Sequence, residues 1–116
     1  MTRDDQTRTE QLLPGTLEML VLKTLSLGPL HGYGIAQHIQ RLSGEALRVE
    51  EGSLYPALQR LALKGWVSSK WKLTPTKRRA RYYTLTAAGR KQLGLEASAF
   101  ERLVAAIGRV MQADVG

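Results

Sequence analysis

The stretch EEGSLYPALQRLALKGW, from Glu50 to Trp66, decides the fold because it predicts a helix whose two sides differ in chemistry. Leu54, Leu58 and Leu61 recur at helical spacing and predict the side that packs into a core. The early proline suits the first part of a helix and the glycine near its end suits a stop, so we expect a helix over residues 53–64. Its outward side carries polar and basic groups without an acid, which is typical of a surface that meets a partner.

Two helices and a minimal strand are predicted before this segment. Residues 14–27 have apolar positions at helical spacing, with Pro14 suited to the first turn and a Gly-Pro pair closing the helix. The same spacing predicts a second helix over residues 32–42, which a Ser-Gly pair ends. Residues 47–49 alternate in the manner of a short strand.

The period of the pattern changes from 3.6 to 2 after the central helix. WVSSKW and ARYYTLT are strand-like and flank the turn-forming segment LTPTKRR, which predicts a β-hairpin over residues 66–85. Tyr83 and Leu85 share one strand face and are expected in the core, whereas Arg81 and Tyr82 point to opposite faces. Thr86 is expected to cap a long helix that follows.

The long helix carries apolar residues at alternating spacings of four and three, the pattern of a heptad seam. We predict that this seam is a dimer interface, because a core built from three helices leaves no room for it. Its residues are Leu93, Ala97, Phe100, Val104, Ile107 and Met111.

The order helix, helix, short strand, helix, β-hairpin, long helix predicts an α+β fold, mainly α with a small β-hairpin, of the winged helix-turn-helix kind. We expect a flexible N-terminal arm over residues 1–11, a winged helix-turn-helix domain over residues 12–86 and a C-terminal dimerisation helix over residues 87–116. The central helix is then the recognition helix, because an α-helix fits the major groove of B-form DNA.

Charge indicates the kind of partner. The chain has 116 residues and a net charge of +7, and residues 52–95 carry ten basic side chains and no acid. A block of one sign is typical of a surface for a polyanion, and nucleic acid is the leading candidate, although a basic surface that serves solubility is the simpler alternative. The absence of cysteine and of an apolar run near the roughly 20 residues of a membrane span predicts a soluble, cytoplasmic protein.

Nine residues of this basic region are candidates for contacting DNA. Ser53 and Tyr55 are expected to meet phosphate, although Ser53 could serve as a plain helix cap and Tyr55 could pack its ring at the edge of the core. Gln59 and Arg60 are candidates for base edges. Four cations of the predicted hairpin, the wing of this fold, are expected to bind phosphate or the minor groove. The complete set is Ser53, Tyr55, Gln59, Arg60, Lys64, Lys77, Arg78, Arg79 and Arg81, of which the last four form the wing.

Enzymatic chemistry is not expected. His31 and His38 are seven residues apart, too far along a helix to share a metal ion without other ligands, and Glu50-Glu51 has no nearby second acid or nucleophile. The simpler role of these two acids is to stabilise the dipole of the central helix. We therefore predict no catalytic residue, no metal and no cofactor.

Three segments give the chain a family resemblance: LLPGTLEMLVLKTLSLGPLHGYGIAQHI, EEGSLYPALQRLALKGWV and RRARYYTLTAAGR. The sequence resembles the PadR family of bacterial transcriptional regulators, and its tail resembles the subgroup that ends in a single helix. The resemblance implies a homodimer formed through the C-terminal helix, a palindromic DNA operator and repression as the usual effect. Family members commonly carry an acid where this chain has Ala62 or Leu63, and some sense planar drugs through an aromatic of the dimer helix, where this chain has Phe100 alone.

Two other classes of function compete with a DNA-binding regulator. A basic winged surface also suits an RNA-binding or ribosome-associated protein, which competition between duplex DNA and structured RNA would distinguish. A protein-interaction module would use the heptad helix to join a different protein. A small-molecule effector of unknown identity is possible in a dimer cleft beside the first and last helices.

Overall fold

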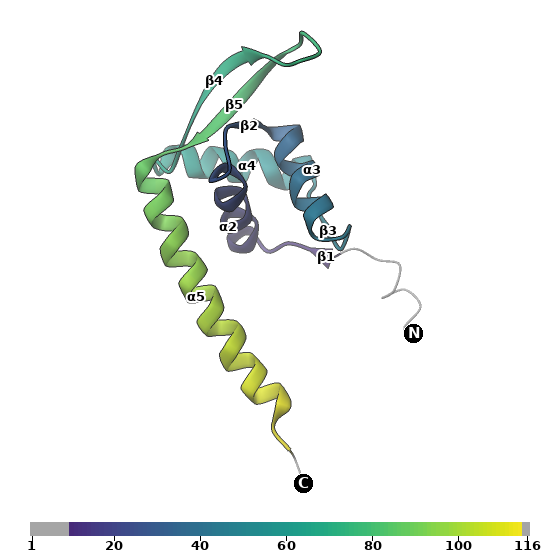
Figure 1. Ribbon diagram of the computed structural model, residues 1–116, viewed down its shortest axis with the longest axis vertical. Coiled ribbons are helices and arrows are strands. Elements are labelled where there is room, and N and C mark those ends of the chain that lie inside the picture. Colours follow the sequence, from purple (N-terminus) through teal and green to yellow (C-terminus); the bar gives the residue numbers. More distant parts are fainter. Residues whose placement is uncertain (1–9, 115–116) are drawn as a thin grey trace.

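The computed structural model describes residues 10–114, and its elements follow the predicted order (Figure 1). Three helices form the centre of the fold: α2 (Pro14–Leu25), α3 (Gly32–Leu42) and α4 (Glu51–Leu63). The hairpin consists of β4 (Val67–Leu73) and β5 (Arg79–Leu85), and α5 (Ala87–Gln112) is the long last helix. The hairpin and α5 project from the helical centre in opposite directions. The predicted α+β winged helix-turn-helix fold is confirmed.

Most helix boundaries agree with the sequence, and the differences have local causes. The bounds of α3 are those predicted, whereas α2 ends at Leu25, two residues earlier than expected, with Ser26 as its C-cap. Helix α4 begins at Glu51 with Glu50 as N-cap, so the interpretation of Ser53 as a cap is wrong. Thr86 caps α5 as predicted, because its Oγ1 accepts a hydrogen bond of 3.0 Å from the amide of Gly89.

Two small sheets contain pairings that the sequence did not predict. In the larger sheet, β5 lies between β4 and the two-residue strand β2 (Leu30–His31), both antiparallel to it. In the smaller sheet, β3 (Leu47–Arg48) pairs in parallel with β1 (Glu10–Gln11). Glu10 and Gln11, which the sequence analysis placed in the N-terminal arm, thus form a strand, and residues 1–9 lie outside the described part of the chain.

The core lies where α2, α3, α4 and the base of the hairpin meet. The inward-facing residues predicted for α4, Leu54, Leu58 and Leu61, are almost completely buried. Tyr83 and Leu85 of β5 are also buried in this core, as predicted. The hydrophobic centre therefore holds the outward side of α4 and the hairpin in a fixed relation to each other.

The long helix joins the domain through a close backbone contact. The amide of Thr86 donates to the Trp66 carbonyl at 3.0 Å and its hydroxyl donates to the Gly65 carbonyl at 2.7 Å. A Cβ added at Gly89 would lie 2.0 Å from the Trp66 carbonyl oxygen, so a glycine is needed for the first turn of α5 to come this close. The turn after α4 and the start of α5 are thus locked together.

Candidate nucleic-acid interface

A polar groove of about 320 Å³ runs between α4 and the hairpin. Predicted DNA-contacting residues meet here, because Tyr55 and Gln59 of α4 lie on one side and Arg81 of β5 on the other. The Nε of Arg81 donates a hydrogen bond of 2.8 Å to Ser69 Oγ on β4, which holds the guanidinium along the strand. The groove is lined by Tyr55, Leu58, Gln59, Ala62, Ser69, Arg81 and Tyr83.

The Tyr55 side chain is partly packed against the domain and partly exposed. Its ring lies against the first residue of α3, since a Cβ added at Gly32 would come within 2.8 Å of the Tyr55 hydroxyl. Nevertheless 46% of the residue is exposed, on the side of α4 that lines the groove. A tyrosine anchored by its ring and partly open to water is suited to hydrogen bonding with a phosphate.

The buried phenol at the base of the groove is Tyr83. Burial raises the pKa of this phenol above its ordinary value of 10.0, while the positive charge of Arg81 lowers it and Tyr55 raises it. The neutral phenol is therefore the form that the fold favours at physiological pH. Tyr83 supports the groove from within the core, in agreement with its predicted position.

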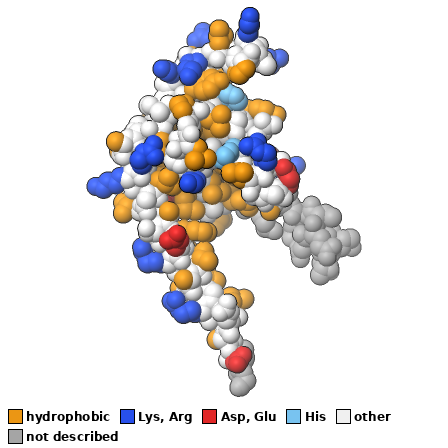
Figure 2. All heavy atoms as spheres, in the orientation of Figure 1, with side chains coloured by type: hydrophobic (Ala, Val, Ile, Leu, Met, Phe, Trp, Pro, Cys, Tyr) orange, Lys and Arg blue, Asp and Glu red, His pale blue; other side chains and the backbone are white. Residues whose placement is uncertain are grey.

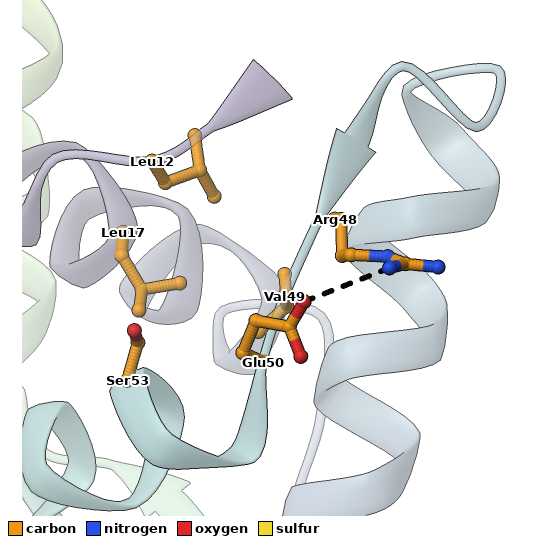
Figure 3. Close-up of a pocket in the computed structure, with 6 residues that line it drawn as sticks. All are labelled: Leu12, Leu17, Arg48, Val49, Glu50 and Ser53. Carbon is orange, nitrogen blue, oxygen red and sulfur yellow. Dashed lines mark ion pairs between the residues drawn. The ribbon is translucent and has the colours of Figure 1, made fainter. Parts of the chain in front are cut away.

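The N-terminal end of α4 is less suited to an anion than the groove. The Ser53 amide already donates a hydrogen bond of 3.0 Å to the Glu50 carbonyl, so only the Ser53 hydroxyl could donate to a phosphate. Glu50 lies beside Ser53 in a small cavity, where Arg48 is 3.7 Å from its carboxylate (Figure 3). With Glu51 in the first turn, this end of the helix is acidic, which stabilises the helix dipole but repels phosphate.

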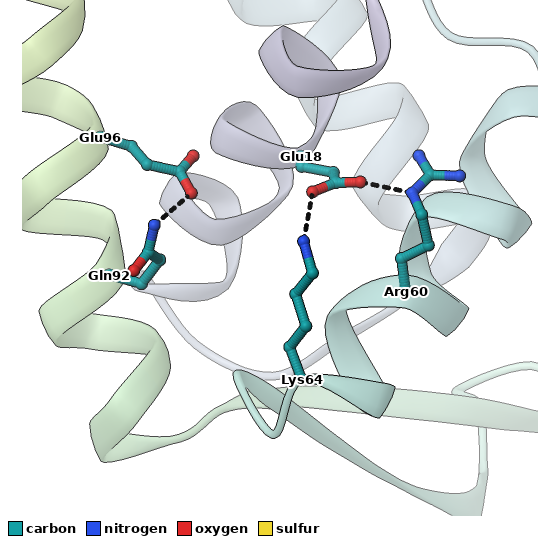
Figure 4. Close-up of polar contacts among 5 residues, drawn as sticks. All are labelled: Glu18, Arg60, Lys64, Gln92 and Glu96. Atoms are coloured by element: carbon teal, nitrogen blue, oxygen red, sulfur yellow. Dashed lines mark hydrogen bonds and ion pairs between the residues drawn. The ribbon is translucent and has the colours of Figure 1, made fainter.

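Arg60 and Lys64 lie on the flank of α4 that faces α2, where both approach Glu18 (Figure 4). Glu18 is buried and accepts from the Arg60 Nε at 2.5 Å, while Lys64 Nζ lies 4.0 Å from its other carboxylate oxygen. Lys64 also sits 4.8 Å from the centre of the Trp66 ring. Sequence reasoning missed Glu18, because it is 42 residues from Arg60 in the chain. These two cations are therefore partly neutralised within the fold.

The tip of the hairpin carries a cluster of exposed cations. A tight turn links its strands, with the Thr74 amide donating to the Arg78 carbonyl at 2.7 Å and the Lys77 amide donating to the Thr74 carbonyl at 2.8 Å. Lys77 adopts a φ of 67° at the tip, a conformation that favours glycine. Lys77, Arg78 and Arg79 are all exposed, and Figure 2 shows basic side chains gathered at this end of the molecule.

Aromatic rings contact two cations of the hairpin, Lys72 and Arg79, on opposite faces of the strands. Lys72 lies 4.7 Å from the centre of the Tyr82 ring, whose other contact is an edge-on packing against His31. Arg79 lies 5.3 Å from the centre of the Trp71 ring. The sequence analysis did not single out Trp71, although its strand pairing with a basic strand is a signal that could have found it.

The predicted seam on α5 divides into two parts. Leu93 is half-buried and packs against the core of its own chain, and Ala97 is half-buried. Farther along, Phe100, Val104, Ile107 and Met111 are between 45% and 76% exposed. Leu103 and Val110 are also exposed and were not part of the predicted seam. The distal half of α5 therefore carries a continuous uncovered apolar side.

Within residues 10–114, no helix is long and apolar enough to cross a membrane. In the same part of the chain, no group of three or more His, Asp and Glu side chains is arranged to hold a metal ion.

Residues 21–95 match the model of the transcriptional regulator PadR-like family. This chain belongs to that family. PadR-like proteins are transcriptional regulators and not enzymes, which confirms the family predicted from the sequence. DNA-binding regulation is therefore the activity that family membership implies.

Two curated relatives match the chain over part of their own length. The chain is 44% identical over 84% of its length to an uncharacterised 37.1 kDa protein of a transposon in Streptomyces fradiae. It is 29% identical over 66% of its length to the negative transcriptional regulator PadR of Bacillus subtilis. The chain spans 26% of the first relative and 42% of the second.

Solved structures have the same fold over nearly their whole length. A transcriptional regulator from Clostridium thermocellum superposes with a TM-score of 0.75 at 28% identity, covering 82% of this chain and 92% of that one. A PadR family regulator from Eggerthella lenta gives a TM-score of 0.72 at 29% identity, covering 86% and 85%. A Streptococcus mutans protein gives 0.80 at 25% identity, covering 94% and 98%.

Proposed function

We propose that this chain is a sequence-specific DNA-binding repressor that acts as a homodimer on a palindromic operator. The observation that carries the proposal is the groove between α4 and the hairpin, where Tyr55, Gln59 and Arg81 come together. The hairpin that forms one side of the groove also carries the exposed cations Lys77, Arg78 and Arg79, and neither β4 nor β5 contains an acid. Repression is supported by the name of the Bacillus subtilis relative, a negative transcriptional regulator.

In this proposal α4 reads the bases and the hairpin binds the phosphates. Gln59 and the exposed side of α4 would enter the major groove, where an amide makes paired hydrogen bonds to adenine. The hairpin would contact flanking phosphates through Lys77, Arg78 and Arg79, which contributes affinity without sequence discrimination. Arg60 and Lys64 would contribute less charge than their number suggests, because Glu18 lies against both.

A homodimer would be formed through the distal half of α5. A single protomer leaves Phe100, Val104 and Ile107 about half exposed, and covering such a side with a second copy removes apolar surface from water. Each copy would then present one α4, so two half-sites about one helical turn apart would be bound together. The predicted domain division, with α5 as the dimerisation helix, rests on the same exposed side.

The salt dependence of duplex binding tests the DNA interface. Replacing Lys77, Arg78 and Arg79 with alanine is expected to reduce the slope of log affinity against log salt by about 0.9 for each phosphate that the variant no longer neutralises. The matched control replaces Lys23, Arg41 and Arg102, which are exposed cations on α2, α3 and α5. An equal change of slope in both variants would contradict the role of the hairpin, and tighter binding to structured RNA than to duplex DNA would contradict the choice of DNA.

Sedimentation of an Ile107→Glu variant tests the dimer. A charge in the middle of the apolar side is expected to give a monomer, because burying it between two helices is costly. Arg102→Glu introduces the same side chain on the opposite side of α5 and should leave the dimer intact. A dimeric Ile107→Glu protein would refute the assignment of the interface.

A further inference from the structure

One face of the hairpin packs into the core near α4 and, farther toward the tip, is apolar and exposed. Val67 is buried at the base of β4, and the residues that follow it on the same face are Ser69, Trp71 and Leu73. Trp71 is 56% exposed and Leu73 is 65% exposed. Neither side chain is needed to fill the core, so the exposed pair requires an explanation outside the folding of the domain.

Each of these two apolar residues lies directly opposite an arginine. Trp71 pairs with Arg81 and Leu73 pairs with Arg79 in the antiparallel register. Arg79 also crosses diagonally to Trp71, and its guanidinium carbon lies over the indole, 5.3 Å from the ring centre. The surface therefore alternates apolar and cationic groups, and it adjoins the groove through Ser69 and Arg81.

We propose that Trp71 and Leu73, together with Arg79, form a contact surface for the sugar–phosphate backbone of duplex DNA beside the half-site. This inference rests on the proposed DNA-binding function. A DNA backbone alternates anionic phosphates with deoxyribose rings that have apolar faces, and the hairpin surface alternates the complementary groups. The cations would pair with the phosphates, and the indole and leucine would cover the sugars between them.

A second protein is a poorer fit for this surface than DNA. The hairpin contains no acid, and a second copy of the hairpin would bring the same positive charge against Arg79 and Arg81. A polyanion removes that repulsion. Charge complementarity thus selects nucleic acid as the occupant, and a protein occupant is an outcome that the experiment can detect.

An apolar contact has a signature that a charge contact lacks. Burying the indole against a sugar releases no counterions, so its contribution to affinity should not depend on salt concentration. Trp71→Ala is expected to weaken binding about tenfold at every salt concentration, because the exposed half of an indole ring is then no longer buried against the DNA. The slope of log affinity against log salt should stay that of the unmodified protein. Arg78→Ala is the contrasting control, because it should reduce the slope.

Fluorescence tests the same contact directly and does not depend on the folding of an alanine variant. The chain has two tryptophans, so the difference in emission between the unmodified protein and Trp71→Phe isolates the signal of Trp71. Saturating operator duplex is expected to shift this signal to shorter wavelength and to protect it from acrylamide. Trp71→Phe should retain most of the affinity that Trp71→Ala loses, because an aromatic ring remains on the surface.

The outcomes separate this inference from the function on which it rests. If duplex DNA binds and Trp71 stays fully accessible to acrylamide, or if Trp71→Ala binds as tightly as the unmodified protein, the apolar contact is wrong while DNA binding stands. Protection of Trp71 that grows with protein concentration in the absence of DNA would assign the surface to a protein contact and overturn the proposal. Failure of the unmodified protein to bind any duplex would overturn both.

Discussion

Replacing Gly89 with alanine tests whether the backbone contact between α5 and the end of α4 holds the long helix in place. The added Cβ would lie 2.0 Å from the Trp66 carbonyl oxygen, 2.7 Å from Leu85 Cδ1 and 2.9 Å from the Trp66 carbonyl carbon. Two of these atoms belong to the backbone and cannot rotate away. The first turn of α5 must therefore move by about 1 Å, which strains the hydrogen bonds that Thr86 makes to the turn.

Gly94→Ala on the same helix is the matched control, because an added Cβ at Gly94 would meet no atom within 4 Å. Both substitutions gain about 1 kcal/mol of helix propensity, so that gain cancels between the two variants. The difference between them isolates the cost of the clash, about 1–3 kcal/mol in free energy of unfolding. Gly94→Ala should exceed the unmodified protein in stability, and Gly89→Ala should fall below Gly94→Ala by that amount.

Thermal unfolding followed by far-ultraviolet circular dichroism measures this difference. For a domain of this size, 1 kcal/mol corresponds to a shift of about 4 °C in Tm, so the two variants should be separated by about 4–12 °C. Protomer concentration must be equal in all samples, because dimerisation through α5 would make Tm depend on it. If Gly89→Ala unfolds at the same temperature as Gly94→Ala or above it, the contact does not restrain α5 and the reasoning fails.

Three further substitutions test individual residues in and around the site. Glu18→Gln removes the ion pair with Arg60 and should lower the free energy of unfolding by only about 1 kcal/mol, because solvent screens the partly exposed Arg60. A double-mutant cycle with Arg60→Gln, measured by urea unfolding, should show coupling between the two residues; no coupling would mean that the pair is not formed. Lys77→Gly should stabilise the protein by about 1 kcal/mol, because glycine adopts the positive φ of residue 77 without strain. The same substitution should weaken duplex binding, because it removes a cation. A loss of stability would show that the backbone at Lys77 is not strained. Because burial raises the pKa of Tyr83, stability should be complete below about pH 10 and decline as the pH rises through the folded-state pKa, and Tyr83→Phe should abolish that decline in alkaline unfolding titrations.

Periodicity predicted the fold well because it records which side of each element avoids water. The leucines of α4, the bounds of α3 and the cap at Thr86 were all predictable from local pattern. The two-residue strands β1 and β2 were not, because such short segments become strands only through the partners that they meet. The interpretation of Ser53 as the helix cap was also wrong, because α4 has Glu50 as its N-cap and begins about one turn before Ser53 would have started it.

The candidate site was predicted in composition but not in arrangement. The sequence identified Arg60 as a cation on an outward side of α4, but not that Glu18 of α2 accepts its Nε. It identified the cations of the hairpin, but not that Trp71 supports Arg79. It placed Leu93 in the same seam as Phe100, whereas Leu93 packs against its own core. Each difference involves a contact between residues on separate elements or strands.

The sequence by itself determined that the stretch from Glu50 to Trp66 contains a helix, predicted over residues 53–64, with a leucine side turned inward and an acid-free side turned outward. Helical spacing and charge are local properties of the chain. Only the tertiary structure decided which residues of that outward side pair with Glu18 of α2 and which line the groove with the hairpin. Packing α2 against one flank neutralises part of the charge of Arg60 and Lys64, and packing the hairpin against the other flank makes the groove of Tyr55, Gln59 and Arg81. Electrostatic interactions and grooves depend on distances in space, which the positions of residues along a chain do not specify.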